Sequence, residues 1–183
     1  MRDFTERTLD SKLVYDGKLL EVREDNVSLP DGQTALREYI VHPGAVIILP
    51  MLDEHTVLVE RQFRYPLHQH FLELPAGKID PGEAHAVTAR RELLEETGFS
   101  ADRMEYLTAG PASAGLTSEV ITFFRAVGVH QVSAGGGDET EQIVVHAIPL
   151  SWLRSWLRER EAEGLMVDYK IFAGLYLAGQ FPS

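Results

Sequence analysis

The chain has 183 residues, of which 44% are hydrophobic and 25% are charged, a composition typical of one globular domain with a substantial core. Its formal net charge of −11 argues against a general nucleic-acid-binding protein, which would present a basic surface. The absence of cysteine excludes a disulfide framework, a thiolate metal site and a cysteine nucleophile.

Residues 1–10 contain no apolar signal segment, and no run approaches about 18 apolar residues, so we expect a cytoplasmic protein without a membrane span.

The N-terminal part of the sequence predicts a small β-sheet. Residues 11–40 alternate as strands do, and turn residues at 16–17 and 30–32 divide them into three strands. These strands are read either as a small antiparallel sheet before the main domain or as an extra edge of the core sheet.

Three further segments predict the strands of a core. Residues 44–50 form a continuous apolar run, as expected of a strand covered on both faces. Residues 56–64 return as its partner strand, and residues 71–77 lead directly toward a helix. A sheet that runs into a helix suits a metal site, because a rigid sheet fixes the positions of the helical side chains.

The helix that follows is predicted at residues 84–97. Its apolar residues Val87, Leu93 and Leu94 can face a core, and Gly98 fits a left-handed cap at the carboxyl end.

This helix carries acids on one face, because Glu92, Glu95 and Glu96 are spaced i, i+3 and i+4. Like charges at this spacing repel by about 0.2–0.5 kcal/mol per pair. The helix dipole disfavours each negative charge in the last turns by about 0.3–1 kcal/mol. The pattern fits either a solvated acidic face or a divalent cation such as Mg²⁺, which prefers carboxylate and carbonyl oxygens.

The remaining sequence predicts alternating strands and loops and a helical C-terminus. The predicted elements are strands at 104–107, 120–127 and 143–148, loops at 110–116 and 133–142, and helices over 150–157 and from 168 onward. The loop at 133–142 is rich in glycine and acids and is expected to be mobile. In the last helix, Ile171, Leu175 and Tyr176 are expected to face the core.

The acidic helix and the turn before it resemble the signature of the Nudix hydrolases. The matching positions are Gly77, Glu83, Arg91-Glu92-Leu93, Glu95-Glu96 and Gly98-Phe99, at the spacing of that signature. Every fixed position matches, which makes the resemblance highly specific. It implies hydrolysis of a nucleoside diphosphate linked to another moiety, with Mg²⁺ or Mn²⁺ as cofactor. It also implies an α/β fold of the Nudix type, an α/β/α sandwich with a mixed sheet.

The N-terminal sheet resembles that of one Nudix subgroup, the ADP-ribose and nucleoside diphosphate sugar pyrophosphatases. This resemblance implies an N-terminal β segment at residues 1–42 and a Nudix catalytic domain at residues 43–183. It also implies a homodimer in which the segment is exchanged between subunits and helps to form the pocket for the base. We therefore expect a nucleoside diphosphate sugar as substrate, and neither nucleic acid nor a membrane as partner.

The resemblance assigns roles to individual residues. The metal ligands that it implies are Glu92 and Glu96, with Glu95 in support and the carbonyl of Ala76. Arg91 and Glu83 are expected to hold the turn and orient these carboxylates. Either Glu141 or Glu139, in the loop before the last strand, is expected to act as general base, with Glu141 the better match. The composition of that loop by itself also fits a polar loop tip.

Other residues are expected in the same cleft. The resemblance places Arg64 on the phosphates and Glu73 near the metals, and Ser118 and Glu119 are expected to line the cleft with them. The basic run that ends in Arg64 equally fits solvent contacts at the end of a strand. Arg37 loosely matches a base-contacting arginine of the N-terminal sheet.

One loop departs from the subgroup. Members that cleave ADP-ribose often carry a proline in a Ser-Pro-Gly-like sequence beyond the signature, and this chain has Ala114 at that position. The departure leaves a GDP-sugar or a nucleoside triphosphate as alternative substrates of the same chemistry. A non-catalytic module that senses a nucleotide sugar is the alternative from a different class.

Overall fold

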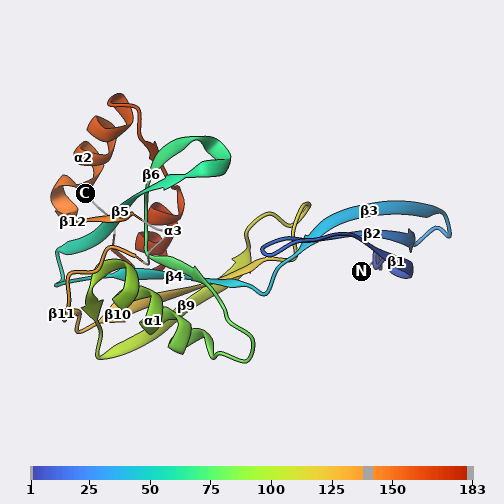
Figure 1. The fold of residues 1–183 in the computed structure, drawn as a ribbon, viewed down its shortest axis with the longest axis horizontal. Helices are drawn as coiled ribbons and strands as arrows, with labels where there is room; N and C mark the ends of the chain where they lie inside the picture. The colour runs from blue at the N-terminus through green and yellow to red at the C-terminus, as the bar shows by residue number, and fades with distance from the viewer. Residues whose placement is uncertain (1, 138–141, 181–183) are drawn as a thin grey trace. The chain divides into compact units, whose positions relative to one another are not determined.

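The computed structural model describes residues 2–137 and 142–180. The chain divides into two compact units, called unit 1 and unit 2. Unit 1 consists of Met1–Gly44 and Gly110–Ile121, and unit 2 consists of Ala45–Ala109 and Thr122–Ser183. Figure 1 shows the helices and strands of both.

Unit 1 is built on a three-stranded antiparallel sheet. Its strands are β1 (Arg7–Asp16), β2 (Glu21–Ser28) and β3 (Thr34–Val41), in the order β1-β2-β3. In the turn between β2 and β3, the Leu29 N–H donates to the Gln33 carbonyl, and Gly32 has a φ of 86° that favours glycine. The predicted small antiparallel sheet is confirmed as a separate sheet. Its first strand begins at Arg7, earlier than the alternation from residue 11 indicated.

The segment at residues 112–119 lies along the edge of β3. The Ile40 N–H donates to the Leu116 carbonyl, and the Ser118 N–H donates to the Ile40 carbonyl, both at 2.9 Å. The Ser118 Oγ also accepts a hydrogen bond from the His42 N–H at 2.9 Å. A segment predicted only as a loop of small residues therefore extends the sheet of unit 1.

Unit 2 contains the other strands and the helices. The strands are β4 (Ala45–Pro50), β5 (Thr56–Arg64), β6 (Gln69–Glu73), β7 (Ala76–Lys78), β8 (Phe99–Ser100), β9 (Arg103–Pro111), β10 (Val120–Val127), β11 (His130–Gln131), β12 (Val144–Pro149) and β13 (Met166–Val167). The helices are α1 (His85–Thr97), α2 (Leu150–Ala162) and α3 (Lys170–Leu177), and η1 (Tyr65–Leu67) is a 3₁₀ turn. Strands β9 and β10 lead the chain into unit 1 and back.

The strands of unit 2 form two larger sheets. One has the order β7-β4-β10-β9 and the other the order β12-β5-β6-β13, while β11 pairs with β8. Strand β5 is antiparallel to β12 and β6, and β13 is parallel to β6, so the second sheet is mixed. Helix α1 packs on β4 and β7, α2 on β12 and β13, and α3 on β4. The predicted α/β class with a mixed sheet and helical cover is therefore confirmed, and Figure 1 shows these layers.

The core of unit 2 fixes the position of α1. Leu93 is fully buried in a cluster with Val46 and Ile48 of β4 and Phe124 of β10. Burial of one such leucine side chain contributes about 1.5–3 kcal/mol relative to exposure. Packing therefore positions the helix, whose N-cap residue Ala84 makes no side-chain capping bond. No helix among the described residues is long and apolar enough to cross a membrane.

Some predicted core positions are wrong. Val87 is 54% exposed, Leu94 is 38% exposed and Tyr176 is 64% exposed, whereas Ile171 and Leu175 are buried as predicted. The buried residues of α1 are instead Thr88, Ala89, Leu93, Glu96 and Thr97. The apolar pattern indicated the wrong face, because Glu96, three residues after the buried Leu93, lies on the same side of the helix as that leucine.

Candidate active site

The acids of the signature lie at the carboxyl end of α1. The helix ends at Gly98, whose φ is 76° and whose N–H donates to the Leu94 carbonyl, as the predicted left-handed cap requires. Glu92, Glu95 and Glu96 therefore occupy the last turns, where the helix dipole disfavours negative charge.

Two of these carboxylates lie against strand β7. The Glu96 residue is only 4% exposed, and its Oε2 accepts a hydrogen bond from the Ala76 N–H at 2.9 Å. A Cβ atom at Gly77 would overlap the carboxylate of Glu92, so any side chain there would displace that acid from its present position. Strand and helix together hold the two acids about 6 Å apart along the helix axis.

Arg91 links the acids of α1 to the turn before it. Its Nη1 lies 2.7 Å from Glu92 Oε1 and 3.2 Å from Glu95 Oε2, and its Nη2 lies 3.0 Å from Glu83 Oε2. The hydrogen bond to Glu83, followed by those to the other acids, raises the pKa of Arg91. The pKa of Glu83 is lowered by Arg91 and then by the hydroxyl of Thr88. These contacts support an orienting role for Arg91 and Glu83.

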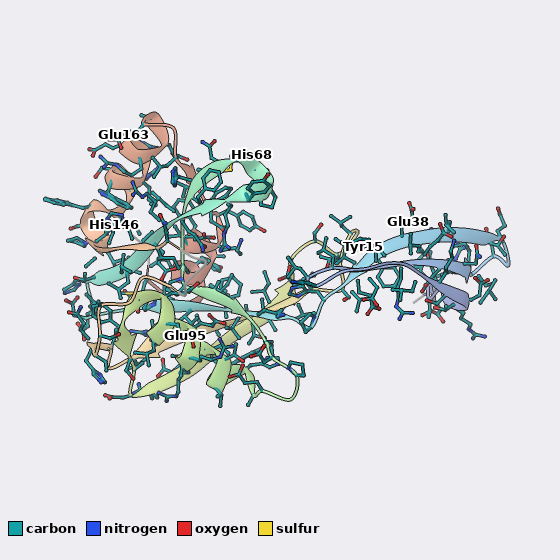
Figure 2. All side chains as sticks on the ribbon, viewed as in Figure 1. Tyr15, Glu38, His68, Glu95, His146 and Glu163 are labelled. Carbon is teal, nitrogen blue, oxygen red and sulfur yellow. The ribbon has the colours of Figure 1, made fainter. Side chains whose placement is uncertain are left out.

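The acids differ in how far they reach into solvent. The Glu92 side chain is 13% exposed and the Glu95 side chain is 53% exposed; the position of Glu95 on α1 is labelled in Figure 2. Arg90 does not share the neutralising role of its neighbour, because its guanidinium donates to the carbonyls of Ala101 and Asp102. Of the two adjacent arginines, Arg91 is therefore the one that pairs with Glu92 and Glu95.

The donors at this end of α1 fit a hard divalent cation. Across residues 2–137 and 142–180, no three acidic or histidine side chains are arranged to hold an ion by themselves. Mg²⁺ does not require such a group, since it is commonly held by one or two carboxylates together with waters and substrate phosphates. Glu92 and Glu96, both largely buried, supply carboxylate oxygens of the right kind, while Arg91 neutralises part of the charge of Glu92.

The glycine-rich segment before β12 is attached to the end of α1. The N–H groups of Gly136 and Gly137 donate to the carbonyls of Glu96 and Glu95, at 2.8 and 3.1 Å. These bonds satisfy carbonyls that a helix otherwise leaves without an intrahelical partner. Glycines that the sequence indicated only as part of a mobile loop therefore cap the signature helix.

Close approach explains why this segment needs glycine. Gly135 has a φ of 66°, and a Cβ atom there would overlap the backbone of Thr97. The candidate general bases, Glu139 and Glu141, follow the attached glycines within four positions of Gly137 and lie outside the described residues.

A second pair of buried acids lies on the hairpin of β5 and β6. Glu60 and Glu73 face each other directly in the antiparallel register and are 2% and 7% exposed. Arg64 Nε donates to Glu73 Oε1 at 2.9 Å, and the arginine side chain remains 40% exposed. Burial raises the pKa of Glu73, and the bond to Arg64 opposes this shift. The structure thus brings Arg64 and Glu73 together as an ion pair with its acid inside.

Sequence reasoning did not single out Glu60. The register of the hairpin carries the signal that points to it. Arg64 pairs with Gln69, so the residues four positions further from the turn, Glu60 and Glu73, also pair. Counting outward from the turn therefore places Glu60 opposite Glu73.

The other predicted residues, Arg37, Ser118 and Glu119, lie in unit 1, whereas the acids of α1 lie in unit 2. Arg37 binds Glu6 through Nε at 2.9 Å and Nη2 at 2.6 Å. Glu119 Oε1 lies 3.6 Å from Nδ1 of His42, the residue whose N–H binds Ser118. A cavity of about 570 Å³ in this unit is lined in part by Arg37 and Ser118. Glu6 and His42 carried no signal in the sequence, because their partners are distant along the chain.

Known proteins resemble the chain over nearly its whole length. Residues 41–166 match the NUDIX domain, and residues 6–40 match the nucleoside diphosphate sugar hydrolase N-terminal domain. A methanol dehydrogenase activator of Bacillus methanolicus is 35% identical over 158 residues, which cover 86% of this chain and 85% of that protein. An ADP-ribose pyrophosphatase of Bacillus subtilis (strain 168) is 33% identical over 172 residues, which cover 93% of each.

A solved structure supports the fold. The crystal structure of an ADP compounds hydrolase has a TM-score of 0.80 to this chain at 23% identity, over 98% of this chain and 96% of that one. The mixed α/β fold is shared with that structure. The NUDIX domain match and the ADP-ribose pyrophosphatase relative identify the chain as a pyrophosphohydrolase. The chain belongs to the Nudix family, as its signature predicted.

Proposed function

We propose that this Nudix pyrophosphohydrolase cleaves the diphosphate bond of ADP-ribose or a related nucleoside diphosphate sugar. The products would be a nucleoside monophosphate and a sugar phosphate. The observation that carries the proposal is the seating of Glu92 and Glu96 on β7, in the space at Gly77 and on the N–H of Ala76. The substrate class is supported by the N-terminal domain match at residues 6–40 and by the ADP-ribose pyrophosphatase relative.

The catalytic cation would be held at the end of α1. We propose Mg²⁺ or Mn²⁺ on the ligands Glu92 and Glu96, with Glu95 and the carbonyl of Ala76 in support. A bound ion of this kind neutralises phosphate charge and lowers the pKa of an attacking water. Arg91, held in its charged form by Glu83, would keep the carboxylates oriented.

The chain's own residues would bind the phosphates and move the proton. The exposed guanidinium of Arg64, fixed from inside by Glu73, would bind a phosphate of the substrate. Water would attack one phosphorus, the bridging oxygen would leave with the other phosphate, and the water proton would pass to a carboxylate. Glu141 is the preferred acceptor and Glu139 the second. Both follow the segment that is attached to the carbonyls of the acidic helix.

Unit 1 is proposed to serve the base of the substrate. We propose residues 1–42 as a base-binding segment that includes Arg37, and residues 43–183 as the catalytic domain, which carries Ser118 and Glu119 as further substrate-binding residues. A homodimer and a cytoplasmic location remain predictions. The exposed apolar side chains of β1, including Leu9 at 58% and Leu13 at 46%, support a second copy as their cover. Light scattering after gel filtration tests the dimer, and a mass near 20.5 kDa would reject it.

The reaction is tested by one substrate panel. Purified protein with Mg²⁺ or Mn²⁺ should release a nucleoside monophosphate from ADP-ribose faster than from GDP-mannose or from a nucleoside triphosphate, measured by anion-exchange chromatography. Glu96→Gln should lower kcat by about 10²-fold or more with an unchanged melting temperature, because a misplaced reacting group commonly has that effect. Near-normal turnover in the folded variant would defeat the metal assignment.

A second candidate is a module that recognises a nucleotide sugar without hydrolysing it. One observation favours it, namely that a 35% identical relative is named for the activation of another enzyme. A binding module has no need for Glu92, Glu95 and Glu96 crowded at one helix end, which is why hydrolysis is preferred. Binding of ADP-ribose without any monophosphate release across the panel, with either cation, would establish the second candidate instead.

A further inference from the structure

The ion pair between Glu6 and Arg37 engages the Nε–Nη2 edge of the guanidinium. Arg37 Nε and Nη2 donate to the two carboxylate oxygens of Glu6 at 2.9 and 2.6 Å. The remaining nitrogen, Nη1, donates to the carbonyl of Leu36 at 2.9 Å. A guanidinium bonded through all three nitrogens has a fixed plane, because such fork-like pairs add geometric definition as well as energy. A ligand then meets this arginine through its flat face.

The two residues of this ion pair line the cavity of unit 1. The cavity measures about 570 Å³. Small-molecule sites in proteins typically measure about 300–1,000 Å³. Its volume is therefore suited to a nucleoside-sized group.

The charges of the cavity indicate which part of a nucleotide sugar it would take. Glu6 and Asp25 line the cavity beside Arg37, and Asp25 lies directly opposite Arg37 in the pairing of β2 and β3. Glu38, labelled on β3 in Figure 2, belongs to the other face of that strand, because successive side chains alternate. This excess of negative charge disfavours a phosphate. Tyr39 also lines the cavity, and its hydroxyl donates to Asp25 at 3.1 Å. An uncharged, flat ring fits these surroundings, because arginine stacks on aromatic faces.

We propose that Glu6 is a positioning residue that holds the guanidinium of Arg37 as a flat platform, on which the nucleobase of the substrate stacks. The inference rests on the proposed function, which supplies the nucleobase. It adds a residue near the start of the chain to the machinery of recognition. Glu6 would not touch the substrate, and it would act only through the orientation of Arg37.

Kinetics with ADP-ribose provide the first test. Glu6→Gln removes the charged fork and should raise KM by about threefold to tenfold with kcat unchanged, because part of the stacking energy of the base is lost. Arg37→Lys keeps the charge but loses the plane, and it should raise KM at least as much as Glu6→Gln does. If Arg37→Lys behaves like wild type, the arginine acts as a point charge and the platform is rejected.

The chain offers a matched control on the same sheet. Glu21 pairs with Arg23 at 2.6 Å, and neither residue lines the cavity. Glu21→Gln removes a comparable surface ion pair from unit 1 and should leave KM for ADP-ribose unchanged. A rise in KM equal to that of Glu6→Gln would show a general effect on the sheet and would overturn the inference.

Direct binding separates this inference from the proposed function. Calorimetry should show weaker binding of AMP to Glu6→Gln than to wild type, by about threefold to tenfold, and unchanged binding of ribose 5-phosphate, which lacks the base. Absence of hydrolysis in wild type would reject the proposed function while leaving this comparison valid. Normal hydrolysis together with equal AMP affinity in Glu6→Gln and wild type would reject the positioning role alone.

Discussion

The two units of the molecule are stabilised in different ways. In unit 2, Val46, Ile48 and Leu93 have no exposed surface, and Leu93 packs α1 against the two residues of β4. In unit 1, every residue of β1 is exposed, and Val27 is the buried hydrophobic residue of strands β1–β3. Tyr15 of β1, labelled in Figure 2, is 57% exposed. One unit has a dense core, whereas the other depends mainly on its backbone ladder and surface pairs.

This difference matches the demands of the proposed chemistry. Carboxylates that hold a cation and act on a phosphorus must be positioned within a fraction of an ångström, which packed elements provide. Glu96 and Glu92 obtain that precision from β7 and from the buried face of α1. Recognition of a base depends on the orientation of one flat group, and unit 1 supplies this through a surface ion pair, Glu6 with Arg37. Substitutions should therefore have larger effects in unit 2 than equivalent ones in unit 1.

The largest difference is expected for leucine truncation. Leu93→Ala removes a fully buried side chain and should lower the free energy of unfolding by about 2–5 kcal/mol, as measured by urea denaturation. Leu13→Ala on β1, where the side chain is 46% exposed, should cost much less in the monomer. Equal losses at the two positions would show that β1 is as fully covered as α1, which would contradict the comparison.

The next largest effect is expected on kcat, from substitution of the glycine beside Glu92. Gly77→Ala places a Cβ on the carboxylate of Glu92 and should lower kcat by about 10²-fold, because the acid must move. Gly110→Ala is the matched control, since no atom lies within 4 Å of the Cβ that it would add. Steady-state hydrolysis of ADP-ribose measures both. Unchanged kcat in Gly77→Ala would mean that the position of Glu92 does not matter.

Local signals were sufficient to predict the helix and its acids. The left-handed Gly98, the turn before the helix and the spacing of the acids are all written within a short stretch of sequence. Contacts between distant residues were not predictable in that way. Arg37 and Glu6 are 31 residues apart, and no periodic pattern reports such a pair. Burial of Glu96 in place of Leu94 likewise depends on the N–H of Ala76, which only the folded sheet brings near.

The glycines before β12 show the same limit. Their number and the acids after them indicate a loop, and a mobile loop was the natural interpretation. The structure adds that Gly136 and Gly137 bind the carbonyls of the signature helix. A glycine required by close approach and a glycine that serves as a hinge are identical in sequence, so packing alone distinguishes them.

Gly135→Ala tests this close approach against a glycine of unit 1. Gly135 has a φ of 66° and would place its Cβ on the backbone of Thr97, whereas Gly32 has a φ of 86° with no atom within 4 Å. Both alanine variants pay about 1–2 kcal/mol for the left-handed backbone. Gly135→Ala should lose additional stability from the overlap, and it should also lower kcat by shifting the loop end. Thermal unfolding of the two variants measures the difference, and equal melting temperatures would reject the attachment of this segment to α1.

The smallest predicted effect is a pH dependence of opposite sign in the two units. Burial raises the pKa of Glu73 above its ordinary value of 4.5, so the folded state binds the proton more tightly than the unfolded state. The stability of wild type relative to Glu73→Gln should therefore fall as pH rises from 4.5 through the folded pKa. The hydrogen bond from Arg37 lowers the pKa of Glu6 below 4.5, so this pair stabilises above pH 4.5 and is lost as pH falls through the folded pKa. Urea unfolding of wild type, Glu73→Gln and Glu6→Gln between about pH 3 and pH 8 measures both slopes. Slopes of the same sign would show that the two acids share one environment, and the contrast between a buried acid and a surface pair would not hold.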